Sequence, residues 1–259
     1  MIKIAFFDID GTILSHTTNS IPSSTIEAFK LLHEKGILCV MATGRHTSEL
    51  KDLPLNDIHF DAYITINGQL CFNNQESIYE SSISKNDISN IYNLIKKYDF
   101  PCAFIEKEIM YLNKVTKEVR KVQKSINTDV YPIKELSRVL SNTIYQVVPY
   151  EIDNKLESLI LEKMPSCKAT RWASCCLDII PKIGGKDLGI KKVLDYYSID
   201  LQDTIAFGDG DNDIDMFKLV NTSVAMGNST NNLKKHATYI TDHIDNDGLY
   251  KALKYFKII

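Results

Sequence analysis

Short apolar runs alternate with amphipathic stretches in the first third of the chain. Residues 2–7, 37–41 and 62–66 are almost wholly apolar, as is typical of strands buried on both faces of a parallel sheet. Between the first two runs we expect a helix that begins with the capping box Ser24 to Glu27 and ends at Gly36. This strand, helix, strand order predicts an α/β fold.

The pattern changes between about residues 83 and 183. Strand-like runs there follow one another in pairs, with helical stretches between the pairs, which indicates an antiparallel sheet with helices on one face. Strand and helix alternate again after Gly184-Gly185. We therefore expect an α/β fold with a Rossmann-like parallel sheet core, formed by residues 1–82 and 184–259, and an inserted α+β domain at 83–183.

Composition favours a small molecule or a protein as partner. The chain has 259 residues, and its 30 basic and 33 acidic side chains give a net charge of -3. This balance gives no electrostatic reason to expect nucleic acid or an anionic membrane. No run approaches the roughly 18 apolar residues of a membrane helix. Because the six cysteines form no C-x-x-C pair, we expect reduced thiols and a cytoplasmic location.

Two carboxylates follow the first apolar run. Asp8 and Asp10 are two residues apart in an extended segment, so their side chains can face one site. Open α/β sheets bind ligands at this end of the strands. Asp10-Gly11 is also a common hairpin turn. The segment alone leaves both interpretations open.

Two further segments contain groups that bind anions. Thr43-Gly44-Arg45 follows the second apolar run, and its hydroxyl and amide groups could hold a phosphate or cap a helix. Lys186 follows Gly184-Gly185, where the chain returns to the predicted core.

An acidic cluster, Asp209 to Asp213, follows the apolar run at 204–207. Acids so close together repel one another unless a cation or hydrogen-bond donors lie among them. An EF-hand loop is excluded because Ile214 and Val220 occupy the positions of its glycine and glutamate. Oxygen ligands without histidine or cysteine favour Mg²⁺ over zinc.

Together these segments resemble the haloacid dehalogenase superfamily, and within it the Cof-type sugar-phosphatase-like hydrolases. The resemblance rests on residues 8–12, residues 43–45, Lys186, and the tail 208–253 with "GDGDNDIDMFKLV", "SVAMGNS" and "DNDGLYKAL". It implies that the insert is a large α/β cap. Asp187 stands where the family usually has glycine, which leaves Lys182 as the alternative motif lysine.

The resemblance implies a Mg²⁺-dependent phosphatase that works through an aspartyl-phosphate. Its expected substrates are small phosphorylated metabolites, with sugar phosphates as the first expectation. Asp8 would be the nucleophile and Asp10 the general acid and base. The implied Mg²⁺ ligands are Asp8, the backbone carbonyl of Asp10, Asp209 and Asp213, and the implied phosphate ligands are Thr43, Gly44, Lys186 and Asn212. Arg45, Asn67 and Gly68 are candidates for the substrate entrance, with a helix-surface or ion-pair role as the alternative for Arg45.

Other functions remain open at this point. A phosphomutase of the same superfamily would use the same core, and a receiver-type signalling module also places acids, a threonine and a lysine around Mg²⁺. A catalytically idle binding protein is a third alternative. Arg171 and Trp172 of the insert could contact the leaving group or serve the fold. We expect a small phosphate ester as substrate, no nucleic acid or membrane partner, and a monomer or homodimer.

Overall fold

The computed structural model describes residues 1–125, 128–173 and 176–259. Cys175 and the side chains of Arg171 and Trp172 lie outside this description. The chain forms two compact units. The core unit comprises Met1–Arg45, Asp52–Glu80 and Gly185–Ile259, and the insert unit comprises His46–Lys51 and Ser81–Gly184. Among the described helices, none has both the length and the apolar character needed to cross a bilayer.

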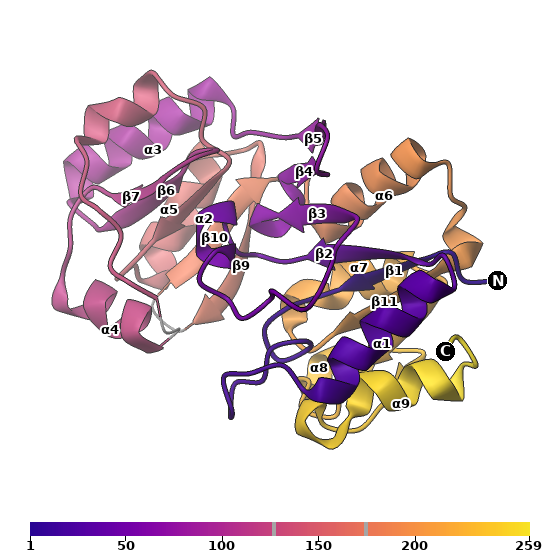
Figure 1. The fold of residues 1–259 in the computed structure, drawn as a ribbon. Coiled ribbons are helices and arrows are strands. Elements are labelled where there is room, and N and C mark those ends of the chain that lie inside the picture. Colours follow the sequence, from indigo (N-terminus) through magenta and orange to yellow (C-terminus); the bar gives the residue numbers. More distant parts are fainter. Residues whose placement is uncertain (126–127, 174–175) are drawn as a thin grey trace. The chain divides into compact units, whose positions relative to one another are not determined.

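The core unit is an α/β layer structure (Figure 1). Its strands are β1 (Ile4–Phe7), β2 (Leu38–Ala42), β3 (Ala62–Thr65), β4 (Leu70–Phe72), β5 (Ser77–Glu80), β11 (Thr204–Gly208), β12 (Thr222–Ala225) and β13 (Tyr239–Ile240). Its helices are α1 (Ser23–Glu34), α6 (Lys186–Tyr197), α7 (Ile214–Leu219), α8 (Asn231–Lys234) and α9 (Gly248–Tyr255). Short 3-10 turns are η1 (Ile66–Gly68), η3 (Leu201–Asp203), η4 (Asp211–Asp213) and η5 (Ile244–Asn246).

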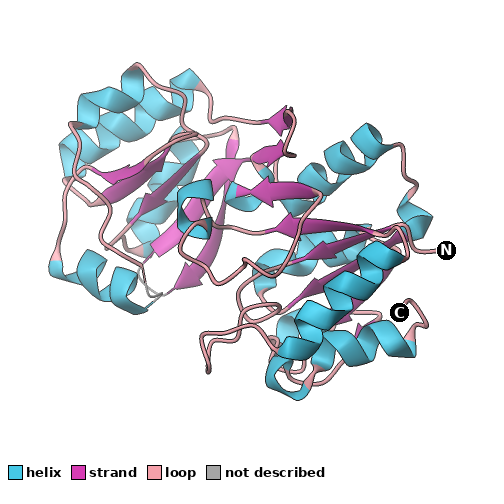
Figure 2. Ribbon diagram, in the orientation of Figure 1, coloured by secondary structure: helices cyan, strands magenta, loops and turns pink. Residues whose placement is uncertain are grey.

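The core sheet has the strand order β13-β12-β11-β1-β2-β3-β4-β5. Strands from β13 to β3 pair in parallel, whereas β3, β4 and β5 pair antiparallel. Helices cover both faces of the sheet (Figure 2). Ile4 and Phe6 of β1 pack in one cluster with residues of α6 and α7, and the Phe7 ring lies 4.6 Å from that of Phe29 in α1. Burial on both faces explains why β1 is a continuous apolar run.

Two local structures differ from the sequence expectations. The hairpin interpretation of Asp10-Gly11 is wrong, because the neighbours of β1 are the parallel strands β2 and β11. The segment instead forms a tight turn in which the Gly11 N–H donates to the Leu14 carbonyl (2.8 Å).

The capping box is also wrong, because α1 begins at Ser23 and has no side-chain cap. The Pro22 carbonyl accepts the N–H of Thr25 (2.9 Å). This contact starts the helix ahead of Ser24, whose hydroxyl donates to Asp247 at 2.6 Å instead.

The insert unit is an antiparallel sheet with the order β7-β6-β8-β10-β9. Helices α3 and α5 pack on it, through residues such as Ile91, Ile95 and Ile160 against Phe104 and Val147. These elements confirm the fold class expected from the sequence. The strands are β6 (Cys102–Ile105), β7 (Met110–Leu112), β8 (Gln146–Pro149), β9 (Cys167–Ala173) and β10 (Cys176–Pro181), and the helices are α2 (Thr47–Leu50), α3 (Lys85–Tyr98), α4 (Lys117–Ser125), α5 (Asn154–Lys163) and the 3-10 turn η2 (Leu136–Leu140).

The described cysteines are buried thiols. They are Cys39, Cys71, Cys102, Cys167 and Cys176. Burial raises the pKa of the Cys71 thiol to about 12, so this side chain acts as a small apolar residue.

Candidate active site

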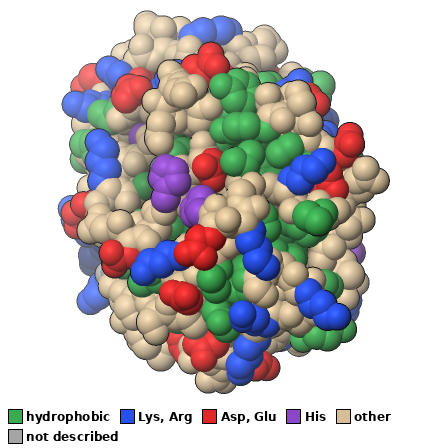
Figure 3. Space-filling view, turned by 45° about the vertical axis from the view of Figure 1, so that its right-hand side comes forward, with side chains coloured by type: hydrophobic (Ala, Val, Ile, Leu, Met, Phe, Trp, Pro, Cys, Tyr) green, Lys and Arg blue, Asp and Glu red, His purple; other side chains and the backbone are tan. Residues whose placement is uncertain are grey.

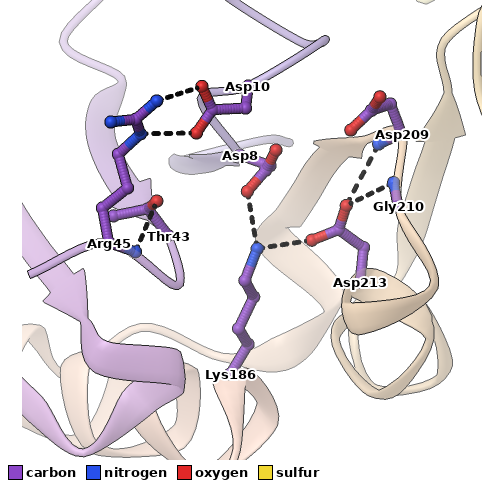
Figure 4. A network of polar contacts seen from close by, with 8 residues as sticks. All are labelled: Asp8, Asp10, Thr43, Arg45, Lys186, Asp209, Gly210 and Asp213. Carbon is purple, nitrogen blue, oxygen red and sulfur yellow. Dashed lines mark hydrogen bonds and ion pairs between the residues drawn. The ribbon is translucent and has the colours of Figure 1, made fainter. Parts of the chain in front are cut away.

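Polar side chains meet at the carboxyl ends of three neighbouring parallel strands. Asp8 follows β1, Thr43 follows β2 and Asp209 follows β11, and both β2 and β11 pair in parallel with β1. Lys186, from the start of α6, points among them (Figure 4). The segments recognised separately in the sequence therefore lie together, at the edge where open α/β sheets bind ligands.

Lys186 joins two acids of this site. Its Nζ lies 2.6 Å from Asp8 Oδ1 and 2.6 Å from Asp213 Oδ1, and its side chain is 1% exposed. Burial alone would lower the pKa of Lys186, but the carboxylates of Asp213 and Asp8 outweigh it and raise the pKa, so the ammonium stays charged. Lys182, the alternative motif lysine, is exposed, and its backbone N–H donates to Ser166 within the insert unit.

Three carboxylates crowd around this one ammonium. Asp8, Asp209 and Asp213 each place an oxygen within 4.8 Å of the others. Burial raises the pKa of Asp8; Lys186 opposes this, and the charges of Asp213 and Asp209 raise it further. Burial and the charge of Asp213 raise the pKa of Asp209 to about 7. Since one positive charge faces three acids, the cluster favours an additional cation.

The donor atoms fit a hard divalent cation. Asp8, Asp209 and Asp213 each offer a carboxylate oxygen. Such ligands suit Mg²⁺ better than zinc. The backbone leaves room for the Asp209 carboxylate at Gly11, where a β-carbon would lie 2.0 Å from Asp209 Oδ2. Asn228 Nδ2 holds the Gly11 carbonyl at 2.7 Å. Gly11 and Asn228 were not among the predicted site residues, although both lie in the quoted motifs.

Asp213 has both carboxylate oxygens occupied. Oδ1 accepts from Lys186, and Oδ2 accepts the backbone N–H groups of Asp209 (3.0 Å) and Gly210 (3.1 Å). The Asp213 side chain is fully buried. Its hydrogen bonds fix both the loop after β11 and the Lys186 ammonium. Asn212, predicted to bind phosphate, is exposed in η4. The η4 side chain that contacts Lys186 is that of Asp213.

Asp10 pairs with Arg45. Arg45 Nε lies 2.7 Å from Asp10 Oδ2, and Nη2 lies 2.8 Å from Oδ1, a two-point contact that fixes the orientation of the carboxylate (Figure 4). The Arg45 backbone N–H donates to Thr43 Oγ1 at 3.1 Å. Arg45 thus forms an ion pair, which was one of its expected roles. The Asp10 carboxylate is outside the cluster of three acids.

The turn after β3 supports the same site. The Asn67 N–H donates to the Thr43 carbonyl (3.2 Å), and the Asn67 side chain lies against Gly44. Gly68 lies against the start of α6, where a β-carbon would be 2.0 Å from the Gly185 carbonyl oxygen. Asn67 and Gly68, predicted at the substrate entrance, therefore pack on the segments that carry Thr43 and Lys186.

Comparisons with known proteins agree with the motifs. Residues 5–253 match the haloacid dehalogenase-like hydrolases. YkrA of Bacillus subtilis (strain 168), which carries a provisional phosphatase name, is 32% identical over 253 residues, 97% of this chain and 96% of its own. The solved structure of the sugar phosphatase BT4131, described as HAD subclass IIB, has 36% identity and a TM-score of 0.87, with 99% and 100% of the two chains covered.

A second solved structure also resembles this chain along its whole length. BT1666 of Bacteroides thetaiotaomicron, described among phosphatases of the haloalkanoate enzyme superfamily, has 32% identity and a TM-score of 0.92. The comparison covers 100% of this chain and 96% of BT1666. The chain therefore belongs to the haloacid dehalogenase-like hydrolases, the family that its motifs predict.

Proposed function

We propose that the protein is a Mg²⁺-dependent phosphatase of small phosphate esters, with sugar phosphates as the preferred class. The observation that carries the proposal is the buried contact of Lys186 with Asp8, beside Asp209 and Asp213. Similarity to the sugar phosphatase BT4131 along nearly the whole chain supports the substrate class.

Asp8 is the proposed nucleophile. Lys186 holds Asp8 Oδ1 at 2.6 Å. Attack by the carboxylate forms a bond from its oxygen to phosphorus while the bond from phosphorus to the alcohol oxygen breaks. Asp10 donates a proton to the departing oxygen. This half-reaction releases the alcohol and leaves an aspartyl-phosphate on Asp8.

Water completes the reaction. It attacks the phosphorus of the aspartyl-phosphate and gives its proton to Asp10, which the first step has left as a carboxylate. The bond from phosphorus to Asp8 breaks, inorganic phosphate forms, and both acids return to their starting states. The contact with Arg45 orients Asp10 as a carboxylate, the state that accepts the proton from water. One Asp10 oxygen must leave Arg45 before Asp10 can donate a proton in the first step.

Negative charge is the main obstacle at this site. Two unit charges about 4 Å apart repel by roughly 4 kcal/mol at an effective dielectric constant of about 20. Asp8, Asp209 and the backbone carbonyl of Asp10 would hold Mg²⁺, with Asp213 as a further ligand or as support. When bound, the ion offsets this repulsion and stabilises the charge on the phosphoryl oxygens.

The remaining contacts to the phosphoryl group come from neutral and cationic donors. We assign these contacts to the Thr43 hydroxyl, the Gly44 amide and the Lys186 ammonium, because such donors stabilise charge that grows in the transition state. Exposed Asn212 is a further donor in the same proposal.

Phosphate release from a panel of phosphate esters, with and without Mg²⁺, tests the proposal. Asp8→Asn should abolish Mg²⁺-dependent release from sugar phosphates. Asp211→Asn is the matched control, because Asp211 is exposed in the same loop and binds Thr230 and Asn232 instead of Lys186. Wild-type turnover in Asp8→Asn would contradict the mechanism, and a product that keeps its phosphate, as in a phosphomutase, would contradict hydrolysis.

A further inference from the structure

Two imidazoles and a carboxylate meet at the amino ends of β2 and β3, opposite the end of the core sheet where Asp8 lies. His33 lies in the last turn of α1, just before β2, and His59 and Asp61 come directly before β3. These positions are at the amino ends of parallel strands, whereas Asp8 lies at a carboxyl end. Figure 3 shows histidine and acidic side chains side by side on the surface of the molecule. The proposed phosphatase reaction uses none of the three residues.

Each oxygen of Asp61 faces one imidazole. His33 Nε2 lies 3.3 Å from Oδ2, and His59 Nε2 lies 3.8 Å from Oδ1. The two imidazole rings are 5.4 Å apart, and one ligand atom from each residue lies within 4.8 Å of the others. The His59 side chain is 62% exposed, so it has room to move the short distance to a shared ion.

Backbone contacts orient two of these side chains. His33 Nδ1 is 2.9 Å from the Phe29 carbonyl, which can only accept, so Nδ1 carries the hydrogen. A neutral His33 ring then directs the lone pair of Nε2 toward Asp61, and such an arrangement needs a proton or a cation between the two groups. The Cys39 N–H donates to Asp61 Oδ2 at 2.8 Å and fixes the carboxylate. Outer contacts of this kind are typical of histidine and carboxylate ligands of metals.

Open space adjoins the cluster. A cavity of about 230 Å³ is lined by His59 and Asp61 together with Asn73, Tyr196 and Tyr197. The Tyr197 hydroxyl donates to the Asp61 carbonyl at 3.1 Å, which ties the cavity wall to the cluster. Water or a small anion could therefore complete the coordination of an ion held by the three side chains.

We propose that His33, His59 and Asp61 form a binding site for a first-row transition metal ion such as Zn²⁺. Two imidazole nitrogens and one carboxylate, with remaining positions filled by water, suit Zn²⁺, Co²⁺ or Ni²⁺ and disfavour Mg²⁺. This donor set differs from the all-oxygen cluster of Asp8, Asp209 and Asp213. The protein thus carries two metal sites of different chemistry, one at each edge of the core sheet.

Calorimetric titration with Zn²⁺ in excess Mg²⁺ tests the site. The full chain and Asp209→Asn should each bind one Zn²⁺ at the histidine site, because Asp209→Asn alters only the acidic cluster. His59→Ala should weaken this binding by about tenfold or more. His243→Ala is the matched control: His243 also faces an acid, Asp245 at 3.6 Å, but belongs to no three-ligand group among the described residues. The Zn²⁺ affinity of His243→Ala should equal that of the wild type.

A second variant, Asp61→Asn, removes the charge of the carboxylate but keeps an acceptor for the Cys39 N–H. This variant should also weaken Zn²⁺ binding, while its circular dichroism spectrum should match that of the wild type. The visible absorption of Co²⁺, substituted for Zn²⁺, should show nitrogen ligation that is lost in His33→Ala. Absence of Zn²⁺ binding to the wild type, or unchanged affinity in His59→Ala, would overturn the proposal and leave His33 and Asp61 as an ion pair only.

Discussion

At Gly11 the backbone passes against the carboxylate of Asp209. Gly11 has a φ of 78°, in the left-handed region, and a β-carbon there would lie 2.0 Å from Asp209 Oδ2. Asn228 holds the Gly11 carbonyl at 2.7 Å, which limits how far this backbone can retreat. A side chain at position 11 must therefore displace Asp209 from the acidic cluster.

Gly11→Ala should lower both stability and Mg²⁺ affinity. The left-handed backbone costs an alanine roughly 1–2 kcal/mol, and displacement of Asp209 adds to this cost. Gly36→Ala is the matched control, because Gly36 has a φ of 70° and no atom within 4 Å of its β-carbon position. Urea unfolding and the Mg²⁺ dependence of phosphate release measure both effects. Equal changes in the two variants would show that the contact with Asp209 is unimportant.

The strands that carry the site are those that the sequence predicts best. β1, β2 and β11 are buried on both faces, so their apolar runs stand out, and the polar residues that follow them mark the ligand edge. β4 and β5 were missed because β4 has three residues and β5 is partly exposed, which leaves little pattern to detect.

Contacts between distant segments could not be predicted from spacing. The pairing of Asp10 with Arg45 joins two loops, and either residue alone is compatible with a surface role. The packing of Gly68 on Gly185 depends equally on two chain segments that the insert separates in sequence. Candidate residues could therefore be found from motifs, whereas their partners required the folded structure.

The contact between η1 and α6 gives a prediction at the level of elements. In Gly68→Ala the new β-carbon would meet the Gly185 carbonyl oxygen, so the start of α6 and Lys186 with it must shift. A shift of about 1 Å at a catalytic group can cost roughly 100-fold in rate, and we expect a loss of kcat of this size. Steady-state kinetics of Gly68→Ala beside Gly36→Ala measure it. Wild-type kcat in Gly68→Ala would mean that η1 does not position Lys186.

In the molecule as a whole, the proposed active site is assembled from both ends of the chain. Asp8 comes from the first strand, while Lys186 and Asp213 come from the segment that follows the insert. The insert unit separates these segments in sequence, yet they belong to one compact unit. The histidine and aspartate cluster, in contrast, lies wholly within the first core segments.

Trapping the phosphoryl group on the protein tests the central claim most directly. The protein is mixed with Mg²⁺ and a sugar phosphate that carries radioactive phosphorus, and the reaction is quenched in acid during the first turnovers. The protein is then digested, and the labelled peptide is identified by mass spectrometry. The proposed mechanism predicts label on the peptide that contains Asp8, and no label in Asp8→Asn. Rapid phosphate release with no labelled protein, or label on another residue, would contradict it.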